Sequence, residues 1–426
     1  MYACVLLFLT GGLLQSPSVH TVDDTPGSGA DFATIQAAVD AAADGDTIRI
    51  ADGSYAGFVV DGKDLAVTAD NAATVQVDGT SRVMNLGSGQ QVLLRKLFLS
   101  GQNEPALVVE QAAGAVWIEE CSLTSGIEPG VWAPGKPGLV ADGAADVRVL
   151  RSLVQGGHGP AELFLSFPGQ HAGAGIEATG SALHVVDSTV TGGQGGSADI
   201  YGLLNSGSGG DAVRLAESQA RVWGSTLTGG NGGYTDYCFC PGGLVCGLAG
   251  HGGNVFAVTA PPGPGSIELL GATITPGLGG PSGTLFGKCS DGAPGANLVG
   301  LPLNDVIVHP GPFRGYWTKS PVDDGGTATL FLEGEPGDVA LIALGAPLAP
   351  TPFPGAIGPL YLAPNALFVF IGPWAPGVLD PLSVPVPQQP AGFETLRLFT
   401  QGAVVTTTGE IRLLAPASLV LIDDGI

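Results

Sequence analysis

Basic and aromatic residues recur at one position of a repeating unit in this sequence. The second residues of successive units are Trp117, Arg148, His184, Arg221 and Glu268. If the units stack about 4.8 Å apart, as neighbouring strands do, these side chains form one column on the outside of a sheet. Arg148, His184 and Arg221, flanked by Trp117 and Trp223, would then bind an anionic sugar through paired Arg hydrogen bonds and ring stacking.

A structural role for this column is the alternative. Acidic side chains in the long loops would neutralise the arginines if the loops folded over the sheet; candidates are Glu162, Asp199 and Asp236. A second column comes from the fifth residues of the units, which are Glu120, Arg151 and Asp187. Their alternating charges predict a surface salt-bridge ladder, which contributes little to stability.

Four cysteines lie in the long loops of successive units and are predicted to form two disulfides, with the pairing left open. They are Cys238, Cys240, Cys246 and Cys289. Disulfides require an oxidising compartment. A zinc site is the alternative reading, but the spacing lacks the paired C-x2-C motif of common zinc sites, so we predict disulfides and no metal there. Cys121 falls at an inward position and is predicted to be a buried thiol.

Threonines occupy the seventh and ninth positions of three units: Thr189, Thr191, Thr226, Thr228, Thr273 and Thr275. This Thr-x-Thr array resembles the flat ice-binding face of some antifreeze solenoids. Threonine is also a good strand former whose side chains interact between adjacent strands, so the array has a structural reading as well.

The repeat itself predicts a solenoid. The units LHVVDSTVTGG, ARVWGSTLTGG and IELLGATITPG start at Leu183, Ala220 and Ile267, and weaker copies precede them. Alternating apolar residues in each unit predict two short strands with a bend between them. The units are separated by four Gly-rich insertions, which we expect to leave from one corner and to need glycine for positive φ and close approach. These insertions are Gly156–Gly175, Gly192–Asp211, Gly229–Asn254 and Gly277–Asn297.

The N-terminal part carries the most specific motif. Residues 31–43 place apolar side chains on one helical face, and a strand follows Gly45. The stretch resembles the N-terminal cap of right-handed parallel β-helix proteins of the pectate-lyase-like superfamily. The matching residues are Thr34, Ile35, Gln36, Ala41, Ala42, Gly45, Asp46, Ile48, Ile50, Gly53 and Tyr55. The resemblance implies a cap helix followed by a β-helix from about Asp46 to Pro310.

The same resemblance directs attention to polysaccharide chemistry. The carboxylate motifs of the hydrolases in this superfamily are nearly absent, and the two Gly-His-Gly pieces (His158 and His251) are expected by chance in so Gly-rich a chain. A uronate-polymer lyase would use Arg148 or Arg221 as the base beside Ca²⁺-binding carboxylates. We therefore predict no cofactor, or calcium if the protein is a lyase, and leave open whether it is an enzyme.

Composition and the N-terminal residues indicate the compartment and argue against some classes of partner. The chain has 426 residues, 70 of them Gly, and 38 acidic against 15 basic residues give a net charge of −23. This balance argues against binding to nucleic acid or to an anionic membrane surface. Residues 1–18 contain a short apolar run that predicts a signal peptide, and no later stretch predicts a transmembrane segment. We expect a secreted, extracellular or cell-surface protein.

Three regions are therefore predicted: a signal peptide (1–18), a capped β-helix with four long Gly-rich loops (19–310), and a C-terminal β domain (321–426). Short period-two segments between prolines in the last region predict a small antiparallel β-sandwich. The expected fold class is all-β. The expected function is a scaffold that binds a glycan or a surface partner through the stacked loops, with the lyase and, less so, ice binding as alternatives.

Overall fold

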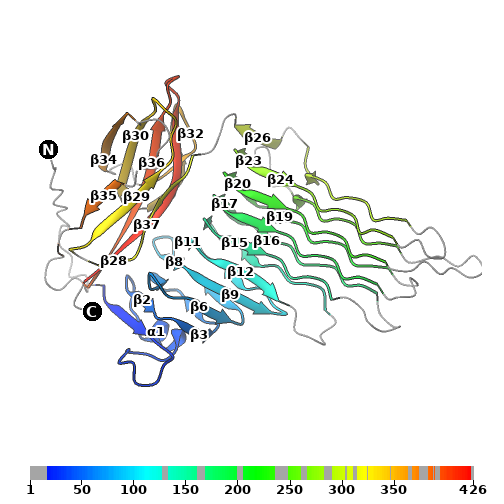
Figure 1. The fold of residues 1–426 in the computed structure, drawn as a ribbon, viewed down its shortest axis with the longest axis horizontal. Coiled ribbons are helices and arrows are strands. Elements are labelled where there is room, and N and C mark those ends of the chain that lie inside the picture. Colours follow the sequence, from blue (N-terminus) through cyan, green and yellow to red (C-terminus); the bar gives the residue numbers. More distant parts are fainter. Residues whose placement is uncertain are drawn as a thin grey trace, which may run out of the picture.

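The computed structural model describes residues 17–423, except 127–132, 161–167, 199–204, 236–247, 261–265, 283–289, 303–304, 310–313, 324, 346, 363–366, 374–381, 387 and 389–393. Most of the described chain forms a right-handed parallel β-helix with three sheets, as predicted (Figure 1). Residues 1–16, the four loop cysteines and the acids Glu162, Asp199 and Asp236 lie outside the described residues. In the described part, no helix is long and apolar enough to cross a membrane.

Sheet A has ten strands. Its first strand precedes the cap helix and pairs with the strand after it, so the sheet begins earlier than the β-helix predicted from about Asp46. The strands are β1 (Val19–Val22), β2 (Thr47–Ile50), β5 (Leu65–Ala69), β8 (Gln91–Arg95), β11 (Ala115–Glu119), β14 (Asp146–Leu150), β17 (Ala182–Val186), β20 (Gln219–Trp223), β23 (Ile267–Leu270) and β26 (Val306–His309). The repeats predicted from the sequence correspond to consecutive strands here, in register.

Sheets B and C each have eight strands. Sheet B contains β3 (Gly53–Ala56), β6 (Val75–Asp78), β9 (Leu97–Gln102), β12 (Ser122–Gly126), β15 (Leu153–Gln155), β18 (Thr189–Thr191), β21 (Thr226–Thr228) and β24 (Thr273–Thr275). Sheet C contains β4 (Val59–Asp61), β7 (Ser81–Met84), β10 (Leu107–Glu110), β13 (Leu139–Asp142), β16 (Ile176–Thr179), β19 (Val213–Ala216), β22 (Phe256–Ala260) and β25 (Leu298–Val299).

One residue with positive φ makes the bend from sheet A to sheet B in successive coils. The corner residues are Lys96, Glu120, Arg151, Asp187, Gly224 and Gly271. The predicted second column therefore occupies a corner of the β-helix, not the middle of a sheet. Just after the corners at Arg151, Asp187 and Gly224 an inward Ser accepts a backbone N–H from the coil before it; Ser188 Oγ, for example, accepts the N–H of Ser152 at 3.0 Å. Cys121 takes this place one coil earlier and is buried, which confirms the prediction; burial raises the pKa of its thiol to about 12.

The N-terminal end of the β-helix is covered by α1 (Ile35–Ala41), as predicted. Thr34 caps this helix by accepting the N–H of Ala37 at 3.2 Å. Ile35, Ala38 and Val39 face the first coil and belong to the continuous apolar core that fills the solenoid. The cap thus closes one end of the core.

The C-terminal region packs against the outer face of sheet A (Figure 1). Its main sheet has the order β28-β37-β36-β30-β34 and is mostly antiparallel, with short β28 and β32 parallel to β37. Two smaller sheets accompany it. The strands are β27 (Tyr316–Thr318), β28 (Val322–Asp323), β29 (Thr327–Leu332), β30 (Val339–Gly345), β31 (Pro347–Pro352), β32 (Ala356–Ile357), β33 (Pro359–Leu362), β34 (Leu367–Pro373), β35 (Leu382–Pro385), β36 (Thr395–Val405) and β37 (Ile411–Ile422).

Candidate functional site

The basic and aromatic column on sheet A exists as a column. Trp117 lies opposite Arg148, Arg148 opposite His184, and His184 opposite Arg221 on adjacent strands. The column does not face solvent, however, because the C-terminal region covers it. Trp117, Arg148, His184 and Trp223 are almost fully buried. The sequence prediction of an open strip on surface strands is therefore wrong, and binding of a ligand there stays a prediction.

Side chains of the C-terminal region and of sheet A itself occupy the positions expected for a ligand. Phe399 lies against Trp117, with ring centroids 4.7 Å apart. The guanidinium of Arg148 lies between the rings of Trp117 and Tyr361, 4.3 and 4.7 Å from their centroids, and donates to Asp146 at 2.9 Å. The hydroxyl of Tyr361 and Nδ1 of His184 are hydrogen bonded at 3.0 Å.

Burial controls the protonation of His184. Loss of hydration, followed by repulsion from the nearby charges of Arg221 and Arg148, holds the pKa of His184 well below its usual value. The imidazole is therefore neutral at pH 7. Arg221 keeps about a quarter of its side chain exposed and is paired with Glu268 at 3.0 Å.

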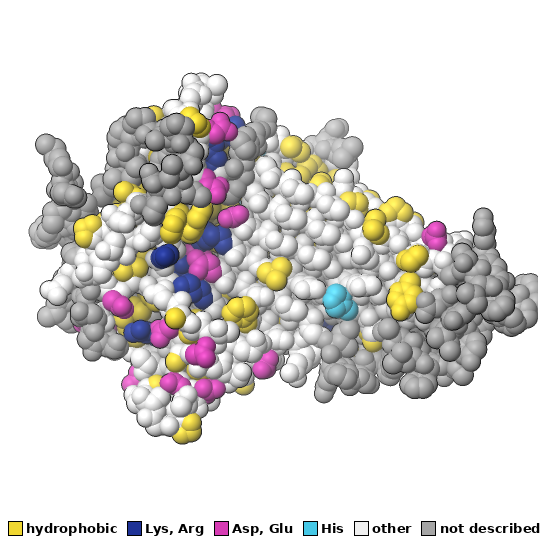
Figure 2. All heavy atoms as spheres, viewed as in Figure 1, with side chains coloured by type: hydrophobic (Ala, Val, Ile, Leu, Met, Phe, Trp, Pro, Cys, Tyr) yellow, Lys and Arg dark blue, Asp and Glu magenta, His cyan; other side chains and the backbone are white. Residues whose placement is uncertain are grey.

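The charged residues next to this column also lie between sheet A and the C-terminal region. Arg95 and Glu119 have fully buried side chains, and Arg95 donates to the carbonyls of Thr318 and Ser418, both at 2.9 Å. Arg151 binds Glu119 and the carbonyl of Tyr316. The predicted surface salt-bridge ladder is present only in part. Arg151 pairs with Glu120 at 4.0 Å, but both side chains lie at the edge of the covered face and Arg151 also binds the buried Glu119. Figure 2 shows charged side chains gathered along this seam and over the first coils.

The Gly-rich insertions form a second structured surface. Outgoing segments continue from sheet B and returning segments lead into sheet C, and in Figure 1 they run side by side away from the β-helix. We call them the glycine slab; its described residues are 156–160, 192–198, 229–235 and 277–282 going out, and 168–175, 205–212, 248–255 and 290–297 coming back. The prediction that the insertions leave from one corner and stack is confirmed.

Hydrogen bonds within the outgoing layer recur every three residues. Gly192 N–H donates to Thr228 O at 2.9 Å, and Gly195 N–H donates to Asn231 O at 2.8 Å. A period of three is typical of polyproline II helices, which form no hydrogen bonds within themselves. Neighbouring segments therefore provide the backbone hydrogen-bond partners that each segment lacks within itself.

A second set of bonds joins the two layers. Gly193 N–H donates to Gly173 O and Gly196 N–H to Gln170 O, both at 2.9 Å. The layers approach so closely that a Cβ on Gly192 would lie 1.9 Å from the carbonyl oxygen of Gly210 in the returning layer. The expected close approach is confirmed, whereas the expected positive φ is wrong for the slab, since the described glycines with positive φ lie elsewhere.

In five of the described turns the remaining N–H is accepted by a side chain of the preceding coil. His158 Nδ1 accepts Gln194 N–H at 2.8 Å, and Asn231 Oδ1 accepts Leu278 N–H at 2.9 Å. His171, Asn205 and His251 do the same in the returning layer. Gly-His-Gly is thus not a chance occurrence but a structural element of the slab.

The outer side of sheet B and its continuation form a flat surface, which we call the sheet B face. It consists of three columns: Leu153, Thr189, Thr226 and Thr273; Gln155, Thr191, Thr228 and Thr275; and His158, Gln194, Asn231 and Leu278. None of these residues is Asp, Glu, Lys or Arg, and all are exposed or half-buried. Tyr234 follows in the next column and is 44% exposed.

No family model and no curated protein matches the chain. Among solved structures, pectate lyase Pel9A is similar over 58% of this chain and 78% of its own, with 12% identity and a TM-score of 0.28. The enzymatically active domain of tailspike protein 4 of bacteriophage CBA120 is similar over 88% of this chain and 64% of its own, with 11% identity and a TM-score of 0.12.

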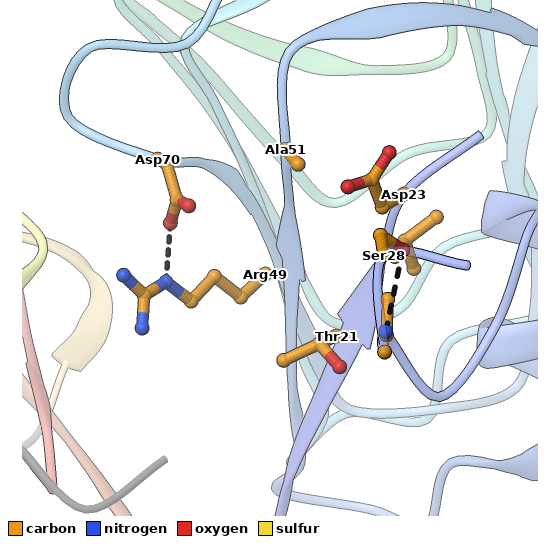
Figure 3. A pocket seen from close by; sticks show the side chains of 9 residues that line it. Thr21, Asp23, Ser28, Arg49, Ala51 and Asp70 are labelled. Atoms are coloured by element: carbon orange, nitrogen blue, oxygen red, sulfur yellow. Dashed lines mark hydrogen bonds and ion pairs between the residues drawn. The ribbon is translucent and has the colours of Figure 1, made fainter. Parts of the chain in front are cut away.

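A small open pocket lies beside the N-terminal cap and has a volume of about 260 Å³ (Figure 3). Arg49 lines it and is paired with Asp70. Asp23 accepts the backbone N–H of Thr25 at 2.8 Å, which lowers the pKa of its carboxyl. Both acids therefore already have partners within the protein. The pocket is a surface hollow formed where a turn packs on the first coil.

Sequence reasoning missed the slab geometry, although a signal for it was present. The spacing Gly-Gly-x-Gly-Gly occurs at 192–196 and again at 229–233. With three residues per turn, two of every three positions face another segment at close range and must be glycine, while the third faces solvent. The third position carries Gln194 and Asn231 in these two segments, which are residues of the sheet B face.

Proposed function

We propose that the protein is a secreted, non-catalytic scaffold that binds a neutral polysaccharide on the sheet B face. The observation that carries the proposal is the uncharged array of hydroxyl, amide and imidazole groups, held in register by the strands and the glycine slab. Such groups exchange hydrogen bonds with sugar hydroxyls, and the exposed ring of Tyr234 offers a stacking surface. A net charge of −23 disfavours an acidic polymer.

Rigidity favours binding without conformational change. Each segment of the slab is tied to its neighbours by backbone hydrogen bonds of 2.7–3.0 Å in most places, so the face exists before the ligand arrives. A preformed surface avoids the entropy cost of ordering loops on binding. The repeat of about 4.8 Å between coils also presents the same groups at regular intervals to an extended polymer.

A steric block on the face tests the proposal. Thr228→Arg places a long side chain at the centre of the sheet B face, and we expect a loss of binding to a neutral glycan of at least tenfold in affinity electrophoresis or on a glycan array. The matched control is Thr179→Arg, an exposed threonine on β16 of sheet C. A parent that binds no neutral glycan, or a control that weakens binding equally, would contradict the proposal.

Ice is the second candidate ligand, because two threonine ladders lie in register on the same face. Thr189, Thr226 and Thr273 form one ladder, and Thr191, Thr228 and Thr275 form the other. Thermal hysteresis of the parent, abolished by Thr228→Arg and kept by Thr179→Arg, would select ice over a polysaccharide.

The lyase alternative has no comparable support. A base must reach its substrate, and the Arg148 side chain is fully buried and paired with Asp146. Arg221 is partly exposed but paired with Glu268, which also interacts with His309.

A further inference from the structure

The two ends of the β-helix differ in how they are finished. At the N-terminal end, α1 covers the first coil. At the other end, β24, β25 and β26 are the last strands of sheets B, C and A, and each is paired on one side only. Within the described part of the chain, no further strand pairs with these three.

The apolar core is open at this end. Val308 lies opposite Leu269 in register, which is an inward position, yet its side chain is 68% exposed. Ile307 on the same strand and Val299 on the edge of sheet C take outward positions and add exposed apolar side chains to this end, at 46% and 47%. Ile274, Leu298 and Val306 pack on the core from one side and are only partly buried. Leaving such side chains in water forgoes the stabilisation that another layer would supply.

The edge strands also lack the features that normally prevent pairing. Exposed edges in natural proteins are usually guarded by charges, prolines or bulges. β24, β25 and β26 contain no Asp, Glu, Lys, Arg or Pro, in a chain with 38 acidic residues. The C-terminal region cannot act as the missing cap in this arrangement, because it is packed on the outer face of sheet A.

We propose that a second copy of the chain covers this end, so that two β-helices join open end to open end. Only another coil of the same β-helix matches both the three edges and the cross-section of the core. The contact is self-complementary, as required for a two-fold dimer. The absence of charge on the edge strands lets two molecules meet there despite a net charge of −23 on each. Assembly stops at two because α1 occupies the opposite end.

Sedimentation velocity over a range of protein concentrations tests this proposal on the full chain. We expect the parent to sediment as a dimer that dissociates on dilution, and Val308→Asp to remain a monomer at every concentration. Val384→Asp is the matched control, because Val384 is also exposed (40%) but lies on β35 of the C-terminal region. This control should dimerise like the parent.

Melting curves establish that each variant is folded. If Val308→Asp does not fold, Val299→Asp provides the same test from sheet C. A parent that stays monomeric at all concentrations, a control that dissociates equally, or an assembly larger than a dimer would each overturn the proposal. The outcome is independent of glycan binding, since the sheet B face and the open end share no residue named in the variants.

Discussion

Sheets A and B of the β-helix are built from the same coils, but their outer faces differ. The outer face of sheet A carries tryptophans, arginines and a histidine, and the C-terminal region buries it. The outer face of sheet B carries threonines and amides and faces solvent. Arginine and tryptophan attract attention as ligand-binding residues, yet here they hold two parts of one chain together. The uncharged outer face of sheet B is the one that remains accessible.

The two faces are also made rigid in different ways. Sheet A is fixed by an apolar layer that includes Trp117, Trp223 and Phe399, with buried ion pairs among them. The continuation of sheet B is fixed almost entirely by backbone hydrogen bonds between glycine-rich segments. Substitutions on sheet A should therefore destabilise the protein by removing a charged partner. Substitutions in the continuation of sheet B should destabilise it by forcing apart segments that only glycine allows to approach closely.

The largest effect is expected from Arg148→Ala on sheet A. Removing the guanidinium leaves the buried Asp146 carboxylate without this partner and opens a gap between two rings. Breaking a buried pair in this way costs about 3–5 kcal/mol. Urea unfolding should show the loss. Arg221→Ala is the control, since Arg221 is partly exposed and Glu268 keeps His309, and it should cost no more than about 1 kcal/mol. Equal effects would mean that the C-terminal region does not shield Arg148.

A smaller effect is expected from Gly230→Ala in the slab. The new Cβ would meet the backbone carbonyl of Gly193 at 1.8 Å, so the two neighbouring outgoing segments must move apart. Overpacking of this kind costs about 1–3 kcal/mol. Calorimetry should show a lower melting temperature. Gly89→Ala has open space around its Cβ and should change stability by no more than about 1 kcal/mol, in the stabilising direction. An unchanged melting temperature for Gly230→Ala would argue against this close packing of the outgoing segments.

The smallest effect concerns pH and the histidine of the covered face. Because the pKa of His184 is depressed in the folded state, the unfolded chain takes up a proton that the folded protein does not as the pH falls below about 6.5. Stability should therefore fall on acidification, by about 1.4 kcal/mol per pH unit from this group. Arg148, Arg221 and the Tyr361 hydroxyl are the groups that face it.

Comparison of the parent with His184→Gln isolates this contribution from that of the carboxylates. The difference in unfolding free energy between the two proteins should shrink as the pH falls from 7 to 5. A difference that stays constant would show that His184 is protonated in the folded protein, as it would be if the face were open to water.

Sequence reasoning predicted much of the fold but not which faces of the β-helix are buried and which are exposed. The repeat and the cap motif sufficed for the β-helix because inward positions and the Thr34 cap are local features. The cover on sheet A could not be derived from the column of charges, since it comes from residues far along the chain, such as Tyr361, which is 177 positions from His184. A usable signal was the apolar character of sheet A strands on both faces, as in Leu93 and Leu150, which is typical of a sheet covered on both sides.

The three-residue period of the slab determines how the sheet B face can change in size. Each turn of an outgoing segment adds three residues, or about 9 Å, and needs three more residues in the returning segment to keep the layers paired. An insertion of one or two residues would instead turn a side chain toward the other layer, where only glycine fits. The width of this face can therefore grow in whole turns, independently of the number of coils that sets its length.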